Sequence, residues 1–430
     1  MSAVAPETTG AQLWLRWRDR AAWVTTSDVF LILVATALPW STSLTAVFTV
    51  AAIVTMAPFF DANAFLQSVK RPVSIVPMAL FVLALAGTLW SDAPWGARLY
   101  AVGPIAKLLM LPLLFYHFER STRGVQVFAA FLVSCIALMA MSWLVAYDPR
   151  FALKAGAEYG VAVKNYIDQS QEFALCAVVL AYPVIVMLRA RRTWLAAMFI
   201  AISVSFVFNM LFVSISRTAL VTIPVMLAVF GLLHLRWRTN LMILSLMIGA
   251  VVVAWTVSPK LEGTVKSFKR DYQLYMERGT STSIGERLEF WKKSAGFIAE
   301  APIIGHGTGS TNGLFEQAAA HAPAVLAAGK VVSNPHNQTL AVAIQWGVPG
   351  ILILYAMWWL HLSLFRGEGL MAWIGLMVVV QNFFTSLFNS HIFDFNEGWM
   401  YVLGVGIAGG TLPRPPLRET PASTSNSVDP

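Results

Sequence analysis

Long apolar stretches dominate the pattern of hydrophobic and polar positions along this chain. Each is about 20 residues long, the length of an α-helix that crosses the hydrocarbon core of a bilayer. Open sheets leave backbone groups unpaired in lipid, and these runs are too long for barrel strands, so helices are expected. The spans are predicted near residues 28–41, 43–60, 72–90, 97–118, 124–147, 170–188, 194–214, 217–235, 240–258, 338–365, 369–388 and 397–412. The pattern therefore predicts an all-α polytopic membrane protein with about twelve transmembrane helices.

The composition agrees with this interpretation. The 430 residues are 57% hydrophobic and only 12% charged, whereas soluble domains carry roughly 25% charged residues. An ordinary soluble enzyme is thereby excluded. The two cysteines, Cys135 and Cys176, both fall within apolar runs, where they behave as small hydrophobic residues and give no sign of a disulfide.

Basic residues predict which connections face the cytoplasm. Residues 1–27 are largely polar and lack the apolar stretch and cleavage site of a signal peptide, so we place them in the cytoplasm. With the N-terminus inside, the second, fourth and every later even-numbered span must end on the cytoplasmic side. Cytoplasmic loops are enriched in Lys and Arg, and the connections after these spans are indeed basic. These connections contain Lys70, Arg71, Arg120, Arg123, Arg189, Arg191, Arg192, Arg236, Arg238, Arg366, Arg414 and Arg418. The net charge of +8 follows from these loops, and no nucleic-acid partner is expected.

The remaining boundaries follow from the spans. Residues 28–258 hold the first nine helices, 259–337 form one large outer loop, and 338–412 hold the last three helices. Long outer loops escape the charge rule, so the many basic residues of 259–337 do not contradict the topology. The outer segment 148–169 is shorter, and the Pro/Ser/Thr-rich residues 413–430 are expected to be a cytoplasmic tail.

Within the large loop, a helix is predicted from Ser283 onward. Leu288, Trp291 and later apolar residues recur at helical spacing, and Ser283 with Glu286 fits a capping box. Arg287 then lies in the first turn, beside the apolar stripe. It is either directed along the membrane surface toward an anion or is a solvated arginine at the lipid headgroups.

Three alternating glycines end this helix at Gly305, Gly307 and Gly309. The segment resembles a phosphate-binding loop only superficially, because it lacks Gly-Lys-Ser/Thr and a preceding buried strand. We interpret it as a tight turn in which backbone passes close to another part of the chain.

The large loop closes with a motif that predicts a helix start. Asn334 fits an N-cap and Pro335 the first helical position, which would place His336 in the first turn at the outer interface. The positive end of the helix dipole disfavours imidazolium, so the ring is expected to stay neutral and able to accept a proton. The alternative is a plain polar contact.

Two further cations have unusual positions. The residues 214–219 connect two apolar runs without room for a loop, which holds Arg217 at the outer membrane edge. There it either clamps a substrate phosphate or extends to lipid phosphate. Lys107 lies in the middle of a span, where an ammonium group is costly and usually faces a polar cavity. Arg98, near the outer end of the same helix, is its candidate companion.

Taken together, these motifs resemble the O-antigen ligase family. The resemblance rests on Ser216-Arg217-Thr218-Ala219, on the helix from Arg287 to Trp291 with the following glycine turn, on Pro335-His336-Asn337, and on Leu89-Trp90-Ser91 upstream. It spans most of the chain, with a core between about 200 and 400. The order of the motifs, with one large outer loop between the ninth and tenth helices, makes the resemblance fairly specific.

The resemblance implies a GT-C-like, metal-independent glycosyltransferase at the periplasmic face of a Gram-negative inner membrane. Such enzymes transfer O-antigen glycan from undecaprenyl diphosphate to the core oligosaccharide of lipid A, with no cofactor. Arg217 and Arg287 match the family's diphosphate-binding arginines, and His336 matches its catalytic histidine. Asn337 and Gln338 are candidate supporting groups. Membrane lipids are the remaining expected partners.

Rival functions stay open at this point. O-antigen polymerases and protein O-oligosaccharyltransferases of the same superfamily use the same arginines and histidine, so only the acceptor separates them. A transporter for lipid-linked glycan predicts ionisable groups near the midplane of several helices, whereas only Lys107 is clearly central. A metal centre would need remote residues to converge and is not expected. Its ligands would come from His306, His321, His336, His391 and Asp394.

Overall fold

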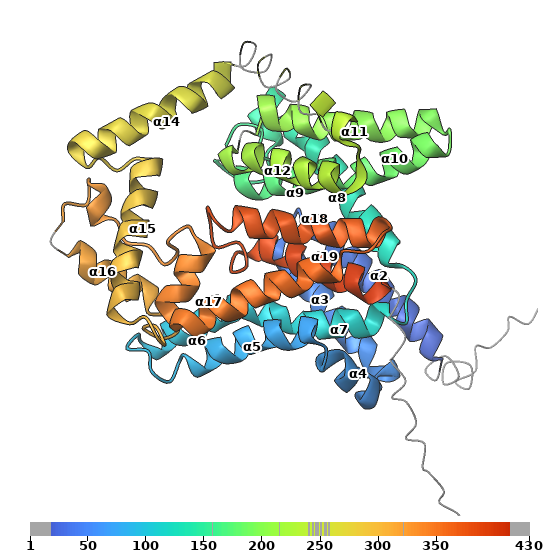
Figure 1. The fold of residues 1–430 in the computed structure, drawn as a ribbon, viewed down its shortest axis with the longest axis horizontal. Coiled ribbons are helices and arrows are strands. Elements are labelled where there is room, and N and C mark those ends of the chain that lie inside the picture. Colours follow the sequence, from blue (N-terminus) through green and yellow to red (C-terminus); the bar gives the residue numbers. More distant parts are fainter. Residues whose placement is uncertain are drawn as a thin grey trace, which may run out of the picture.

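The computed structural model describes residues 19–412, with gaps at 157, 215 and 321 and over most of 240–258. In this part of the chain all regular elements are helices, and the single bridge between Thr280 and Leu326 is isolated. The main helices are α2 (Arg20–Ala37), α3 (Thr42–Met56), α4 (Ala62–Val69), α5 (Pro72–Ala86), α6 (Trp95–Ala106), α7 (Met110–Phe118), α8 (Gly124–Tyr147), α9 (Tyr166–Val179), α10 (Ala181–Arg189), α11 (Thr193–Phe212), α12 (Arg217–His234), α14 (Pro259–Arg278), α15 (Ser283–Glu300), α16 (Thr311–Ala319), α17 (Gln338–Leu364), α18 (Leu370–Thr385) and α19 (Phe395–Thr411). The predicted all-α class is confirmed for the described residues (Figure 1).

Seven helical segments of the described chain are long and apolar enough to cross a membrane. They are Arg20–Ala37, Thr42–Phe59, Trp95–Phe118, Gly124–Tyr147, Tyr166–Arg189, Thr193–Phe212 and Gln338–Leu364. The pair α4 and α5 passes the same test but is bent by 80°. These helices make the chain a multi-pass membrane protein.

The predicted number of about twelve spans is not confirmed. Every predicted span falls on a helix except 240–258, most of which lies outside the described residues. Several of these helices are short: α18 has 16 residues, α19 has 17, and the apolar part of α12 runs only from Val221 to Leu233. The periodicity predicts that a helix forms, whereas packing against neighbours decides how far it extends. The GT-C-like architecture stays a prediction.

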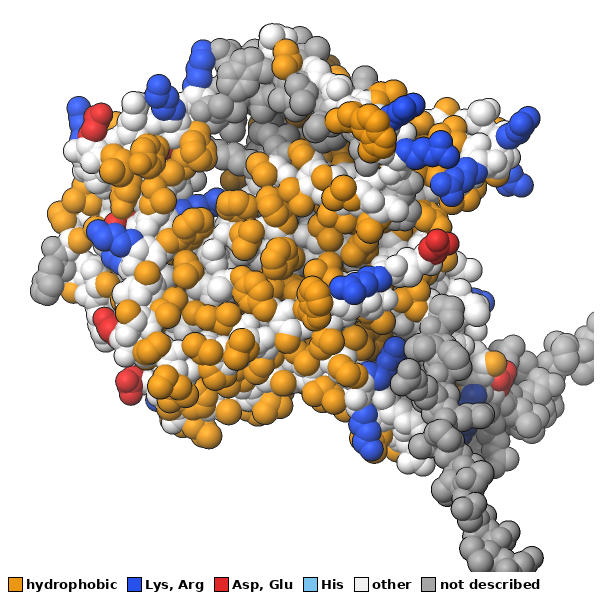
Figure 2. Space-filling view, viewed as in Figure 1, with side chains coloured by type: hydrophobic (Ala, Val, Ile, Leu, Met, Phe, Trp, Pro, Cys, Tyr) orange, Lys and Arg blue, Asp and Glu red, His pale blue; other side chains and the backbone are white. Residues whose placement is uncertain are grey.

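The bundle has two chemically different ends. At one end, which we call the loop end, lie α14, α15 and α16 of the large loop (Figure 1). At the other, the basic end, Arg71 pairs with Glu119 at 2.8 Å and Arg189 shares a cavity with Arg366. Apolar side chains cover much of the surface between the ends in the view of Figure 2. This distribution agrees with a bundle that spans a bilayer from the basic end to the loop end.

Helix α17 is interrupted at Gly347, and the turn with the three alternating glycines Gly305, Gly307 and Gly309, here called the glycine turn, packs into this break. Gly347 has φ 56° and ψ −148°, and Pro349 has no N–H to offer the carbonyl of Gln345. The N–H groups of His306 and Gly307 instead donate to the carbonyls of Ile344 (2.8 Å) and Gln345 (2.9 Å). Backbone groups without partners are costly at membrane depth, so the turn satisfies the carbonyls that the break exposes.

The three alternating glycines are required by space as well as by conformation. Gly305, Gly307 and Gly309 all have positive φ, between 67° and 84°. A Cβ at Gly305 would lie 2.5 Å from the backbone of Gln345, and one at Gly307 2.5 Å from Cα of Ser91. The interpretation of this segment as a tight turn with close backbone approach is confirmed. It joins the turn after α5 to α15 and α17.

The start of α15 differs by one residue from the predicted cap. Thr282, rather than Ser283, is the N-cap, and its hydroxyl accepts the N–H of Gly285 at 3.1 Å. Ser281 donates to the carboxylate of Glu286. The capping box with Ser283 was therefore wrong, because four consecutive hydroxyl residues, Thr280 to Ser283, compete for the cap and Thr282 has the extended backbone that a cap requires.

We expect Gly307→Ala to destabilise the folded protein by roughly 1–3 kcal/mol, because the new Cβ meets backbone at a positive φ. Thermal unfolding in detergent measures the effect. Gly313→Ala in α16 is the control, because a Cβ there meets nothing within 4 Å. Equal unfolding temperatures for the two variants would contradict this account of the turn.

Candidate functional site

His336 lies at the loop end, just before α17 and not in its first turn. Asn337 is the N-cap, and its Oδ1 accepts the N–H of Leu340 at 3.1 Å. Asn334, the predicted cap, instead accepts the N–H of His336 at 2.9 Å. The helix then begins at Gln338, and His336 takes a left-handed backbone with φ 54°. The prediction failed because two asparagines compete, and the one in extended backbone directly before the helix caps it.

A chain of hydrogen bonds orients the imidazole of His336. Its Nδ1 lies 2.9 Å from Oδ1 of Asn389, in the connection between α18 and α19. Nδ2 of the same amide donates to Oδ2 of Asp394 at 2.9 Å. Asn334 also donates to Oδ1 of Asn389, at 3.2 Å. Asn389 therefore joins the histidine to a carboxylate.

This chain selects one tautomer of the histidine. A carboxylate oxygen only accepts, so Asp394 turns the NH₂ group of Asn389 toward itself and the carbonyl oxygen toward His336. Nδ1 of the imidazole must then carry the proton that it donates. In the neutral ring the lone pair is left on Nε2, which is the atom available to accept a proton.

Lys107 supports the same connection from within the bundle. Its side chain is buried, and the ammonium group donates to the carbonyls of Asp394 and Phe393. Lys107 lies halfway along the span Trp95–Phe118, so the connection reaches down into the bundle. The expectation that this lysine faces polar groups is met by backbone carbonyls and by the nearby carboxylates of Asp394 and Glu397.

Asn337 and Gln338 also hold the connection between α18 and α19. Nδ2 of Asn337 donates to the carbonyl of Leu387 at 3.0 Å, and Oε1 of Gln338 accepts the N–H of Ile392 at 2.9 Å. Both side chains are thus engaged with the segment that carries Asn389. In the structure they position the site instead of lining it.

Helix α15 brings an aromatic ring and a positive charge to the other side of His336. The ring of Phe290 stacks on the imidazole, with 6.1 Å between centroids. Arg287, three residues earlier and hence on the same face of α15, is close enough for its charge to act on the histidine. The roles predicted for His336 and Arg287 stay predictions, and the charge of Arg287 acts on the imidazole.

Burial and charge keep the imidazole neutral. Partial burial lowers the pKa of His336 below its ordinary value of 6.5, and the guanidinium of Arg287 lowers this pKa further. The hydrogen bond to Asn389 and the negative charges of Asp394 and Glu286 act in the opposite direction without reversing the shift. The neutral ring with a free Nε2 is therefore the dominant form at neutral pH.

Arg217 and Arg98 have different surroundings. Arg217 begins α12 at the loop end, after the N-cap Ser216, but its side chain lies outside the described part of the structure. Its predicted convergence with Arg287 stays a prediction. Arg98 donates to the carbonyls of Ala93 (2.5 Å) and Thr88 (2.8 Å), which secures the turn between α5 and α6.

One group of the described residues has the spacing of metal ligands. Ligand atoms of His391, Asp394 and Glu397 lie within 4.8 Å of one another. The ammonium group of Lys107 acts on both carboxylates, and this fixed positive charge disfavours a bound cation. The remote histidines do not join the group: His306 bonds the carbonyl of Phe297 at 2.7 Å, and His321 lies outside the described residues.

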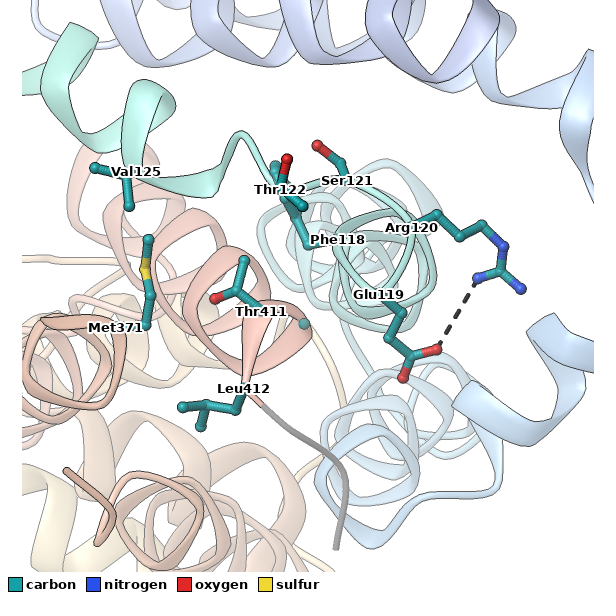
Figure 3. Close-up of a pocket in the computed structure, with 10 residues that line it drawn as sticks. Phe118, Glu119, Arg120, Ser121, Thr122, Val125, Met371, Thr411 and Leu412 are labelled. Carbon is teal, nitrogen blue, oxygen red and sulfur yellow. Dashed lines mark ion pairs between the residues drawn. The ribbon is translucent and has the colours of Figure 1, made fainter. Parts of the chain in front are cut away.

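A cavity at the basic end of the bundle contains none of the predicted site residues. It measures about 770 Å³ and lies between the turn after α7 and the end of α19 (Figure 3). Its charged groups already have protein partners: Glu119 pairs with Arg71, and Arg120 donates to the carbonyl of Tyr116 at 2.6 Å. The loop end therefore holds the better candidate site.

Sequence reasoning missed Asn389 as a partner of His336 and considered Asp394 only as a metal ligand. The available signal was the polar stretch 389–396, an outer connection without a single Lys or Arg. Nothing in its pattern shows that it folds back onto a histidine some 50 residues earlier.

The comparison with known families agrees with these findings. Residues 202–355 match the model of a protein family described as O-antigen ligase. This segment includes Arg217, Arg287 and His336 but ends before Asn389. The match supports the resemblance to the O-antigen ligase family that the sequence motifs between residues 202 and 355 indicate. No curated protein matches the chain.

We expect the imidazole of His336 to titrate below pH 6.5, because its burial and Arg287 disfavour the charged form. Unfolding would let the ring take up a proton at pH 6.5, so the contribution of His336 to stability falls as the pH drops below that value. Nuclear magnetic resonance of labelled histidine measures the midpoint, and His336→Gln assigns the signal. Asn389→Asp should raise the midpoint by roughly one to three units. A wild-type midpoint above 6.5 would refute the assignment.

Proposed function

We propose that this protein is an O-antigen ligase. It transfers a glycan from undecaprenyl diphosphate to a sugar hydroxyl of the lipid A-core oligosaccharide, on the periplasmic side of the inner membrane, without a metal ion. The observation that carries the proposal is the chain of hydrogen bonds from His336 through Asn389 to Asp394, beside Arg287. The family match over residues 202–355 supports it.

The reaction requires a base at the acceptor hydroxyl. Its oxygen forms a bond to the anomeric carbon of the glycan as the bond from that carbon to the diphosphate oxygen breaks. The proton of the hydroxyl passes to Nε2 of His336, and the bonding electrons leave with undecaprenyl diphosphate. Direct displacement inverts the configuration at the anomeric carbon. A neutral imidazole with a free Nε2 suits this role, and general bases of this kind contribute roughly 10²–10⁴-fold to the rate.

The leaving group requires positive charge. Negative charge grows on the diphosphate as the glycosidic bond breaks, and cations held in place beforehand stabilise the transition state. Arg287, whose charge acts on His336, is the first proposed diphosphate ligand. Arg217, at the start of α12, is the second proposed diphosphate ligand. A guanidinium can bond two phosphate oxygens at once, which fixes the orientation of the group.

The lengths of the outer segments favour a ligase over a polymerase of the same superfamily. Polymerases of this superfamily tend to have two sizeable outer loops, whereas here 148–169 is modest beside 259–337. The chemistry at His336 is the same in both cases. The acceptor therefore has to be identified by experiment.

The central test is a reconstituted reaction with purified protein, glycan-linked undecaprenyl diphosphate and lipid A-core, in the presence of a chelator. We expect full lipopolysaccharide from the wild type and a loss of at least about a hundredfold with His336→Ala. Arg287→Gln should also lower the rate, whereas Lys292→Gln, an exposed change in the same helix, should not.

The other outcomes separate the rival functions. Longer glycan chains without lipopolysaccharide would indicate a polymerase, and a labelled protein acceptor a protein glycosyltransferase. Movement of intact donor between leaflets, without transfer, would indicate a transporter. Loss of wild-type activity in the chelator would refute a metal-independent reaction.

Asn389→Ala should lower kcat by roughly a hundredfold, because the imidazole loses the partner that selects its tautomer. The donor KM should change little, since in this account Asn389 acts on the reaction through His336. Initial rates at varied donor and acceptor concentrations separate the effect on kcat from the effect on each KM. Asn312→Ala, an exposed change in α16, is the control. An unchanged kcat would show that Asn389 does not orient the base.

A further inference from the structure

A cavity of about 260 Å³ lies beside the histidine site, where the starts of α9 and α19 meet. Asn389 and Asp394, the two residues that orient His336, form part of its wall. The rest of the wall includes Lys164, Asp168, Phe395 and Glu397. The cavity therefore adjoins the proposed reaction centre on the Asn389 side of the imidazole.

The wall of this cavity has the chemistry of a sugar-binding site. Carboxylates of Asp168 and Asp394 accept hydrogen bonds, and their paired oxygens match the vicinal hydroxyls of a sugar ring. The ring of Phe395 offers an apolar surface to sugar C–H groups. Glu397 is only 6% exposed, and its Oε1 has no hydrogen-bond partner in the described part of the chain. Buried polar atoms are rarely left unpaired, and Glu397 is one of the polar groups in the wall of this cavity.

Size and charge restrict the occupant. Pockets for drug-sized ligands begin at roughly 300 Å³, so this cavity suits a single sugar unit. The carboxylates of Asp168 and Asp394 in the wall repel a diphosphate, which belongs instead with Arg287. A metal ion is disfavoured as well, because the ammonium groups of Lys107 and Lys164 lie among these carboxylates. A neutral polyhydroxyl group remains.

We propose that this cavity binds one uncharged sugar unit of the acceptor and thereby selects which hydroxyl reaches His336. The proposal rests on the proposed transfer reaction. It assigns the cavity beside Asn389 to one sugar unit of the acceptor and the Arg287 side of His336 to the donor diphosphate. Asp168 is the binding residue best suited to a test, because it takes no part in the hydrogen bonds that link His336 to Asn389 and Asn389 to Asp394.

The test measures KM for acceptor and donor separately in the reconstituted reaction. Asp168→Asn keeps the size of the side chain and removes its charge, and we expect the acceptor KM to rise roughly tenfold with an unchanged donor KM. Phe395→Leu should raise the acceptor KM in the same direction. Asp92→Asn, an exposed change in the turn between α5 and α6, is the matched control and should leave both constants unchanged.

Binding without transfer gives a second measurement. Titration of lipid A-core into the His336→Ala protein reports acceptor affinity directly, and Asp168→Asn in that background should weaken binding about tenfold. Thermal unfolding shows whether each variant is folded. An unchanged acceptor affinity in a folded Asp168→Asn protein, or a rise in donor KM alone, would overturn the proposal. If the wild type transfers nothing yet binds lipid A-core through Asp168, the proposed function falls and the sugar site stands.

Discussion

The candidate site depends on the orientation of one side-chain amide. Asn389 offers its NH₂ group to Asp394 and its carbonyl oxygen to Nδ1 of His336. If the amide were reversed, its NH₂ group would face Nδ1, so the neutral ring would have to place its lone pair on Nδ1 and its proton on Nε2. Polar groups from several segments bond the connection between α18 and α19 and keep this amide in place.

The supports come from three parts of the chain. Lys107 bonds the connection from the middle of its span, Gln338 and Asn337 bond it from the start of α17, and Asn334 bonds Asn389 itself. Burial of these polar groups between helices is costly unless each finds a partner. The polar network therefore has few alternative arrangements, which is what a base with a defined tautomer requires.

The glycine turn fixes the large loop to the bundle, as the polar contacts fix the connection between α18 and α19. It passes through the break in α17 and fills the backbone positions that Gly347 and Pro349 leave unpaired. Helix α15 ends at this turn, so Arg287 and Phe290 are held against His336 by contacts more than a helical turn away. The loop is thus docked on the bundle and not merely tethered at its two ends.

Much of this protein was predictable from sequence, because the determinants are local. Runs of apolar residues predict helices wherever lipid forbids unpaired backbone, and the glycines at 305–309 indicate close approach whatever lies next to them. His336 and Arg287 could be singled out from their places in short motifs. Their helix caps were displaced by one to three residues, because neighbouring Asn, Ser and Thr residues cap almost equally well and only the folded backbone selects among them.

Only the tertiary structure shows which side chains form hydrogen bonds with the residues of the candidate site. Asn389 lies 53 residues after His336 along the chain, and Lys107 is 287 residues from Asp394. Such pairs form where separate helices pack, and no periodicity in the sequence encodes which polar side chains will meet there. The sequence by itself determined a multi-pass helical membrane protein with a histidine and arginines at one end. The packing of α17, α18 and α19 determined which nitrogen of that histidine is free and which cavity adjoins it, because both depend on hydrogen bonds between distant segments.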